Sequence, residues 1–145
     1  MQGLIQRVSS ASVSVDSQIV GQINQGILLL LGVQKLDSEE TADKLLQKVL
    51  NYRIFSDSQG KMNLSLRDIG GGLLVISQFT LAADTKKGLR PSFSSAAPPQ
   101  QAEALYEYFL ARANEHHCTV SHGVFGADMQ VSLCNDGPVT FNLQS

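Results

Sequence analysis

Two short, uninterrupted apolar runs most constrain what this chain can fold into. The sequence reads ILLLLGV from Ile27 to Val33 and LLVISQF from Leu73 to Phe79, and a glycine directly precedes each run. A strand whose apolar residues do not alternate with polar ones must be covered on both of its faces. We therefore expect two central strands with other elements packed on either side.

The remaining patterns predict shorter strands around this pair. Alternating residues near the start of the chain indicate a long strand that is bent or bulged around residues 9–12. A turn at Asp16 and Ser17 leads into the next strand, and Asp57 with Gly60 favours another turn. The strands expected in addition to the central pair cover residues 4–15, 19–23, 53–55, 119–125, 129–134 and 139–143.

Two helices are expected, one before and one after the second central strand in the sequence. Asp37 and Glu40 have the spacing of a capping box, and five apolar residues follow at helical spacing. The second helix begins near Pro98 and Pro99, since proline is tolerated in a first turn. The two apolar faces are Ala42, Leu45, Leu46, Val49 and Leu50, and Ala102, Leu105, Tyr106, Phe109 and Ala113. About eight strands interrupted by only two helices predict a single α+β domain over residues 1–145, with a barrel-like wrapped sheet of antiparallel or mixed strands.

Charge and composition limit the possible partners. The chain has 145 residues and a formal net charge of −2, so binding nucleic acid over its whole surface is excluded. Lys86, Lys87 and Arg90 form the only basic cluster, inside a long loop over residues 82–99. This cluster is either a solvated loop or a local contact for RNA phosphates.

The cysteines and the apolar runs indicate the compartment. Cys118 and Cys134 fit no metal-binding spacing, so we expect buried free thiols in a reducing cytoplasm. The chain begins without a signal-peptide pattern, and no apolar run approaches the roughly 20 residues of a membrane span. These observations predict a cytoplasmic protein without a membrane segment.

The usual catalytic motifs are absent, and two segments stand out instead. The sequence contains no GxGxxG, P-loop, HExxH or GxSxG motif. His116 and His117 suit the end of a helix, and His122 is either a surface residue or a base. The segment 77–81, SQFTL, ends a buried strand. It is either the solvated end of that strand or part of a functional site. The segment 135–140, NDGPVT, is either a hairpin turn or a place where a cis peptide bond redirects a carbonyl.

Taken together, the segments SQFTLAADTKKGLRPSF, GVFGADM and NDGPVTF resemble the D-aminoacyl-tRNA deacylases, also called D-tyrosyl-tRNA deacylases. The resemblance extends over the whole chain, including the start with Arg7 and the ILLLLGV strand. It implies an enzyme that hydrolyses the ester joining a D-amino acid, or mischarged glycine, to the 3′-terminal adenosine of tRNA. It also implies a homodimer with a barrel-like sheet and a reaction without a metal or other cofactor.

The resemblance also implies roles for individual residues. The segment 77–81 lines the site, and the Gly137-Pro138 pair, with a cis bond, enters from the other subunit. Phe125 and Met129 lie near the terminal adenine, and Arg7 supports the Gly-Pro pair. The residues placed at the site in this way are Ser77, Gln78, Phe79, Thr80, Phe125, Met129, Gly137, Pro138 and Arg7.

Several alternatives remain open at this point. Backbone N–H groups at Phe79 and Thr80 can stabilise the oxyanion of a hydrolysed ester, or Thr80 can act as a nucleophile. A rigid main-chain carbonyl at Gly137 can exclude an L side chain, because an obstacle is needed to distinguish mirror images that carry the same groups. The competing interpretations are a module that binds RNA ends without catalysis, a purely structural dimeric domain, and a general esterase.

Overall fold

The computed structural model describes residues 1–86 and 88–145, and its sheet is organised around one long strand. This strand, β1 (Gln2–Val15), pairs over its first half with β3 (Gly26–Gly32) and over its second half with β2 (Gln18–Ile23). Along its other edge it pairs with β8 (Gln130–Gln144). The change of partner occurs at residues 9–10, within the segment where the sequence predicts a bend.

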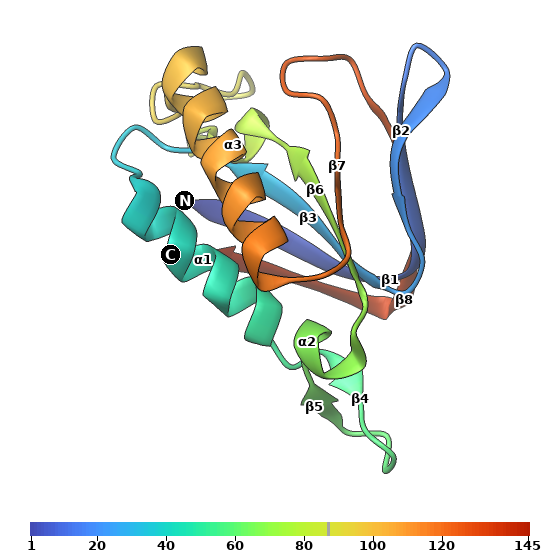
Figure 1. Ribbon diagram of the computed structural model, residues 1–145. Helices are drawn as coiled ribbons and strands as arrows, with labels where there is room; N and C mark the ends of the chain where they lie inside the picture. Colours follow the sequence, from blue (N-terminus) through green and yellow to red (C-terminus); the bar gives the residue numbers. More distant parts are fainter. Residues whose placement is uncertain (87) are drawn as a thin grey trace.

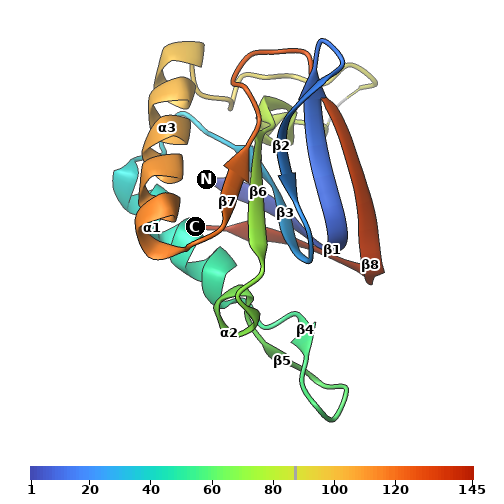
Figure 2. The same cartoon turned by 45° about the vertical axis from the view of Figure 1, so that its right-hand side comes forward.

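The two central strands are β3 and β6 (Gly72–Ser77), which pair in parallel. β7 (Val120–His122) continues the sheet on the far side of β6, also in parallel, giving the order β2-β1-β3-β6-β7. The sheet then curls until β2 approaches β7: a side chain at Gly21 would lie 2.5 Å from the carbonyl oxygen of His122. The Ser121 hydroxyl also donates to the Gln22 carbonyl at 3.0 Å. The result is a nearly closed, mixed, barrel-like sheet, and the expected α+β class is confirmed (Figures 1 and 2).

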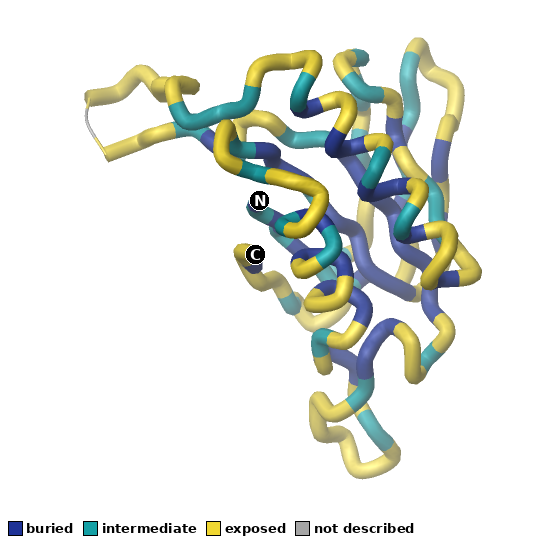
Figure 3. Tube along the Cα trace, turned by 60° about the vertical axis from the view of Figure 1, so that its left-hand side comes forward, coloured by how far each residue is buried: buried dark blue, intermediate teal, exposed yellow. Residues whose placement is uncertain are grey.

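Two long helices cover one face of the sheet. α1 (Glu39–Asn51) and α3 (Pro99–His116) lie side by side against β1, β3 and β6 (Figure 1). Both predicted apolar faces are buried, and they form the main core with the side chains of β3 and β6 that face the helices. A second core fills the interior of the curled sheet and includes Val8, Leu28, Leu74 and Ile76. Both central strands are therefore covered on both faces, as the apolar runs predict (Figure 3).

A small lobe projects from the end of α1. It contains β4 (Phe55–Ser56), β5 (Met62–Leu64) and α2 (Leu66–Ile69) (Figure 1). The predicted turn between β4 and β5 is present, with Gly60 at a φ of 76°. The backbone N–H groups of Lys61 and Gln59 and the side chain of Asn63 donate to Asp57, and these hydrogen bonds hold the pKa of that carboxyl below its usual range.

Two local predictions on the helical side of the sheet are wrong. The cap of α1 is Ser38, whose hydroxyl exchanges hydrogen bonds with Thr41, and not Asp37 with Glu40. Asp37 instead binds the N-terminal ammonium group of Met1 and the backbone N–H of Gln34, so it ties the start of the chain to α1. The strand expected over 53–55 begins only at residue 55.

The end of the chain also differs from its prediction. The segment expected as a strand over 119–125 pairs only over the three residues of β7. The two strands expected over 129–134 and 139–143 are one continuous strand, β8, because residues 135–140 bulge instead of turning back. Cys118 and Cys134 are both exposed, which corrects the expectation of buried thiols. Among the described residues, no helix is long and apolar enough to cross a membrane.

Candidate functional site

A pocket of about 480 Å³ opens at the end of β6. Its walls come from β6, from the 3₁₀ turn η1 (Phe79–Ala82) that follows it, from the first turn of α3 and from the connection between β7 and β8. The lining residues are Ile76, Ser77, Gln78, Phe79, Ala97, Pro99, Ala102, Phe125, Gly126, Ala127, Met129 and Val131. The structure therefore brings together two predicted groups that are far apart in the sequence, the start of the SQFTL segment and the Phe125–Met129 pair.

The SQFTL segment marks an abrupt end to the central strand. The sequence predicts a strand through residue 79, but β6 ends at Ser77, and Gln78 leaves the extended conformation with a ψ of 78°. The Gln78 N–H still donates to the Leu31 carbonyl at 2.8 Å, which fixes this end against β3. A side chain at Gly32 would lie 2.9 Å from Cβ of Leu81, so glycine there allows η1 to pack closely on β3.

The first turn of η1 presents backbone donors next to the pocket. The first N–H groups of a helix have no intrahelical acceptor. Within the described ranges, the N–H groups of Phe79 and Thr80 have no hydrogen-bond acceptor. The Thr80 side chain does not line the pocket, and its hydroxyl accepts a hydrogen bond from Nε2 of Gln78 at 2.6 Å. This turn can therefore supply main-chain donors, while the one hydroxyl on it is held by a neutral amide.

The opposite wall of the pocket is held in place by Tyr106 of α3. Its buried hydroxyl donates to the Val75 carbonyl oxygen at 3.0 Å. The Gly123 N–H donates to the same carbonyl oxygen at 3.1 Å. Burial raises the pKa of the Tyr106 phenol, so the group remains a donor at neutral pH. The Tyr106 ring also packs against Phe125, with ring centroids 5.8 Å apart. Tyr106 thus holds the segment between β7 and β8, which carries Phe125, against β6, which carries Ser77.

Met129 completes this wall because residue 123 is glycine. A side chain at Gly123 would lie 2.5 Å from the Met129 sulfur and 3.3 Å from Cδ1 of Ile76. The thioether therefore occupies the space above Gly123 and packs into the second core. Phe125 and Met129 together give the pocket an apolar side of the kind that takes a planar ring.

The NDGPVT segment forms a bulge opposite Arg7. Gln6 pairs with Thr140 and Val8 pairs with Asn135, so four residues of β8 stand opposite Arg7 alone. The peptide bond between Gly137 and Pro138 is cis, and Gly137 has a φ of 135°. Asn135 closes the base of the bulge, since its side chain accepts from the Val139 N–H at 2.9 Å and donates to the Thr140 hydroxyl at 2.8 Å.

Arg7 ties this bulge to the body of the protein. Its Nε donates to the Asp136 carbonyl at 2.9 Å, and its Nη1 donates to the Ile54 carbonyl at 2.7 Å. Its side chain is 13% exposed, and the guanidinium lies so close that a side chain at Gly137 would sit 2.9 Å from Nη2. The bulge is exposed to solvent, yet its backbone is braced from behind.

The bulge does not line the pocket of its own chain. Arg7, which faces the bulge, pairs with Ile27 of β3, and Ser77, which lines the pocket, pairs with Leu31 of β3. The bulge and the pocket are therefore separated by four residues along β3, roughly 13 Å at the usual rise of a strand. The bulge also lies on β8, on the other side of β1. The sequence-predicted site residues therefore form two separate groups on one chain.

The other predicted residues lie outside this pocket. Lys86 and Arg90 are exposed on the loop between η1 and α3, and Lys87 lies outside the described residues. His122 is exposed at the end of β7, with Nδ1 within 2.8 Å of the Gly123 carbonyl oxygen. His117 is buried, and its Nε2 donates to the Gly71 carbonyl at 2.6 Å, which joins the end of α3 to the start of β6.

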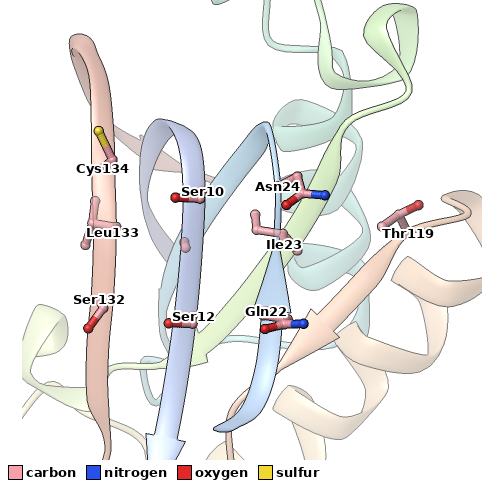
Figure 4. A pocket seen from close by; sticks show the side chains of 10 residues that line it. Ser10, Ser12, Gln22, Ile23, Asn24, Thr119, Ser132, Leu133 and Cys134 are labelled. Carbon is pink, nitrogen blue, oxygen red and sulfur yellow. The ribbon is translucent and has the colours of Figure 1, made fainter.

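A second hollow, of about 570 Å³, lies across β1, β2, β8 and the segment before β7 (Figure 4). Its side chains are mostly small and polar, among them Ser10, Ser12 and Ser132, and the exposed Cys134 also borders it. It contains none of the residues that the sequence assigns to the site. The pocket at the end of β6, by contrast, contains several of those residues and has backbone donors on one side and an apolar wall on the other.

Sequence reasoning missed several residues of the site. The sequence predicts Tyr106 only as part of an apolar helix face, although a buried phenol on such a face needs a hydrogen-bond acceptor and so indicates a contact with a neighbouring main chain. Pro99 and Ala102 line the pocket because α3 begins there. Gly123 begins the GVFGADM segment, but the sequence does not show why glycine is needed there, because only the position of Met129 makes its lack of a side chain important.

Comparison with known proteins places this arrangement in a class. A family model described as D-Tyr-tRNA(Tyr) deacylase matches residues 4–144. Two proteins called D-aminoacyl-tRNA deacylase are similar over nearly the full length: one from Pseudoalteromonas translucida is 70% identical over 99% of both chains, and one from Stutzerimonas stutzeri is 66% identical over 100% of both. The matches thus define a small α+β ester hydrolase that acts on aminoacyl-tRNA. The chain belongs to the D-aminoacyl-tRNA deacylase family.

Two solved structures have the same fold. One described as c-Myc DNA Unwinding Element Binding Protein superposes with a TM-score of 0.96 at 39% identity, covering 100% of this chain and 99% of that chain. Another, described as a probable eukaryotic D-amino acid tRNA deacylase, has a TM-score of 0.83 at 16% identity and covers 98% of both chains. The second similarity concerns the fold alone.

Proposed function

We propose that the pocket at the end of β6 holds the 3′-terminal adenosine of tRNA with its esterified D-amino acid or glycine, and that the N–H groups of Phe79 and Thr80 bind the ester carbonyl oxygen. The observation that carries this proposal is the pair of unoccupied main-chain donors beside an apolar wall. Phe125 and Met129 then contact the adenine, since unstacked bases bind on aromatic and apolar side chains. The reaction takes place in the cytoplasm, with aminoacyl-tRNA as the substrate.

The chemistry required of such a pocket is modest. An aminoacyl ester is already reactive, so fixing it in one geometry next to water provides much of the rate. Water adds to the carbonyl carbon, the bond to the ribose 3′-oxygen breaks, and that oxygen takes a proton, giving the free amino acid and tRNA. Each backbone donor aimed at the developing oxyanion contributes about 2.7–4 kcal/mol. Two such donors supply a large share of the acceleration without a reactive side chain.

Discrimination between mirror images requires a second copy of the chain. The bulge at Gly137 and Pro138 is exposed, braced by Arg7 and remote from the pocket of its own chain. We propose a homodimer in which this bulge of each protomer enters the pocket of its partner and places a main-chain obstacle where an L side chain would point. Glycine has no side chain and passes the obstacle.

The proposed discrimination has a direct test. With the same tRNA, we expect D-tyrosyl-tRNA and glycyl-tRNA to be hydrolysed and L-tyrosyl-tRNA to be cleaved at least about 100-fold more slowly, a difference of about 2.7 kcal/mol in barrier. The measurement is release of the labelled amino acid over time. Comparable rates for both tyrosyl enantiomers would refute steric exclusion, and binding without release would favour a module that holds RNA ends.

The role of Thr80 is tested by removing its hydroxyl while keeping its N–H. We expect Thr80→Val to retain kcat within about threefold of the wild-type protein, because only the hydrogen bond from Gln78 is lost. Thr80→Ser, which keeps the hydroxyl, serves as the matched control. If Thr80 were the nucleophile, the valine variant would lose kcat by orders of magnitude while the serine variant stayed active.

The loop that carries Lys86, Lys87 and Arg90 has a supporting part in this proposal. Lys86 and Arg90 are exposed, and the loop leaves η1 directly beside the pocket. Phosphates of the acceptor end of tRNA would meet these charges as the strand leaves the site, and such contacts depend on salt. The similarity to a protein whose description names a DNA element also favours a nucleic-acid partner.

A further inference from the structure

Two aromatic rings are exposed at the mouth of the pocket. Phe79 is 60% exposed and Phe93 is 42% exposed. Their ring centroids are 5.1 Å apart at an interplanar angle of 53°, so the two rings contact each other. Phe79 also lines the pocket, whereas Phe93 stands outside it. The pair therefore forms an apolar surface that runs outward from the η1 side of the pocket.

The backbone around Phe93 is fixed on both sides. Just before it, Asp84 and Ser92 exchange two backbone hydrogen bonds, of 2.7 and 3.0 Å, which close the base of the basic loop. Just after it, the Ala96 N–H donates to the Phe93 carbonyl at 3.1 Å, and the Ser95 hydroxyl donates to the Ala82 carbonyl. The exposed ring is thus carried by an ordered part of the loop, at the same end as the pocket.

The charges nearby indicate what this ring pair contacts. Lys86 and Arg90 lie on the same loop, beyond the base that Asp84 and Ser92 close. Exposed aromatic rings next to cations are typical of surfaces that bind single-stranded nucleic acid, in which the bases stack and the phosphates pair with the charges. The proposed function fills the adjoining pocket with a nucleoside, so the base and phosphates of the same strand are the groups nearest to these rings and charges.

We propose that Phe93, together with Phe79, binds the base of the nucleotide that precedes the terminal adenosine of the substrate. This inference rests on the proposed function, because the strand can reach the ring pair only if its last nucleoside occupies the pocket. The pocket takes the terminal nucleoside, the ring pair takes the next base, and the loop charges meet the phosphates that follow. Phe93 is then a determinant of specificity for a polynucleotide substrate over a nucleoside ester.

The test compares two substrates that differ only beyond the terminal adenosine. For D-tyrosyl-tRNA, we expect Phe93→Ala to raise KM about tenfold with kcat within twofold, as when one stacked base is lost. For D-tyrosyl-adenosine, which lacks the preceding nucleotide, we expect no change in kcat/KM. Phe93→Tyr keeps a ring and should restore the wild-type KM for D-tyrosyl-tRNA.

Further variants separate this role from others. Met62→Ala removes an exposed apolar side chain at the far end of the molecule and should leave both substrates unaffected. Lys86→Ala combined with Arg90→Ala should also raise KM for D-tyrosyl-tRNA but flatten its salt dependence, whereas Phe93→Ala should keep the wild-type slope.

Three results would overturn the proposal. If Phe93→Ala lowered kcat/KM equally for both substrates, Phe93 would act in the pocket itself. An unchanged KM of Phe93→Ala for D-tyrosyl-tRNA would exclude the contact with the base. A change of sedimentation from dimer to monomer would assign the ring pair to a second copy of the chain. A wild-type protein that cleaves neither substrate would instead refute the proposed function, which is a distinguishable failure.

Discussion

The variant Gly26→Ala should lose at least about 3 kcal/mol of unfolding free energy. Gly26 and Gly72 face each other where the parallel strands β3 and β6 begin. An added Cβ at residue 26 would overlap the carbonyl oxygen of Gly72 and lie 2.7 Å from its carbonyl carbon. Both atoms belong to the main chain, so relief requires the two central strands to separate. For a chain of this size, the expected fall in melting temperature is about 10 °C, measured by circular dichroism.

A glycine elsewhere in the chain provides the control. At Gly60, which has a φ of 76°, an added Cβ would meet no atom within 4 Å. Gly60→Ala therefore carries only the conformational cost of a positive φ, about 1 kcal/mol. Equal losses for the two variants would mean that the contact between Gly26 and Gly72 contributes nothing of its own. A stability for Gly26→Ala close to that of the wild-type protein would contradict the packing of β3 on β6.

The features that could be predicted from the sequence are those encoded by neighbouring residues. The two apolar runs identify the central strands because burial on both faces leaves no polar alternation. The helix faces follow from their 3.6-residue period, and the turn at Gly60 follows from residues that tolerate its conformation. The predictions that are wrong depend on distant partners. Ser38 caps α1 because Asp37 is already bound to the N-terminal ammonium group of Met1, which is 36 residues away in the sequence.

The same distinction applies to the site. The SQFTL and NDGPVT segments are recognisable as continuous motifs, but the sequence alone leaves the second open between a turn and a redirected carbonyl. Only pairing with β1 shows a bulge, because four residues of β8 have a single residue opposite them. Tyr106 and Gly123 contribute through Val75 and Met129, residues that the fold brings to them from other elements. The sequence therefore identifies the segments of the candidate site more readily than the residues that hold those segments in place.

The variant Arg7→Ala should lower kcat/KM for D-tyrosyl-tRNA by about 100-fold or more while the protein remains folded. Arg7 joins the Asp136 carbonyl of the bulge to the carbonyl of Ile54, a core residue just before β4, and nothing else spans these two positions among the described contacts. Without this brace the bulge shifts, and a displacement of about 1 Å at a site costs roughly 100-fold in rate. The measurements are kcat/KM for both tyrosyl enantiomers and the free energy of unfolding.

The pattern of control variants decides whether the brace itself is responsible. Asp136→Asn removes only the exposed carboxylate, 3.4 Å from the Arg7 guanidinium, and keeps the carbonyl, so we expect kcat/KM to fall less than threefold. Arg7→Lys keeps the charge but cannot hold both carbonyls in one geometry, and its activity should fall close to that of Arg7→Ala. If the bulge is the proposed obstacle, its displacement should also narrow the ratio of the D to the L hydrolysis rate in both Arg7 variants. Full activity and an unchanged ratio in Arg7→Ala would mean that the bulge either keeps its position unaided or takes no part in the partner's pocket.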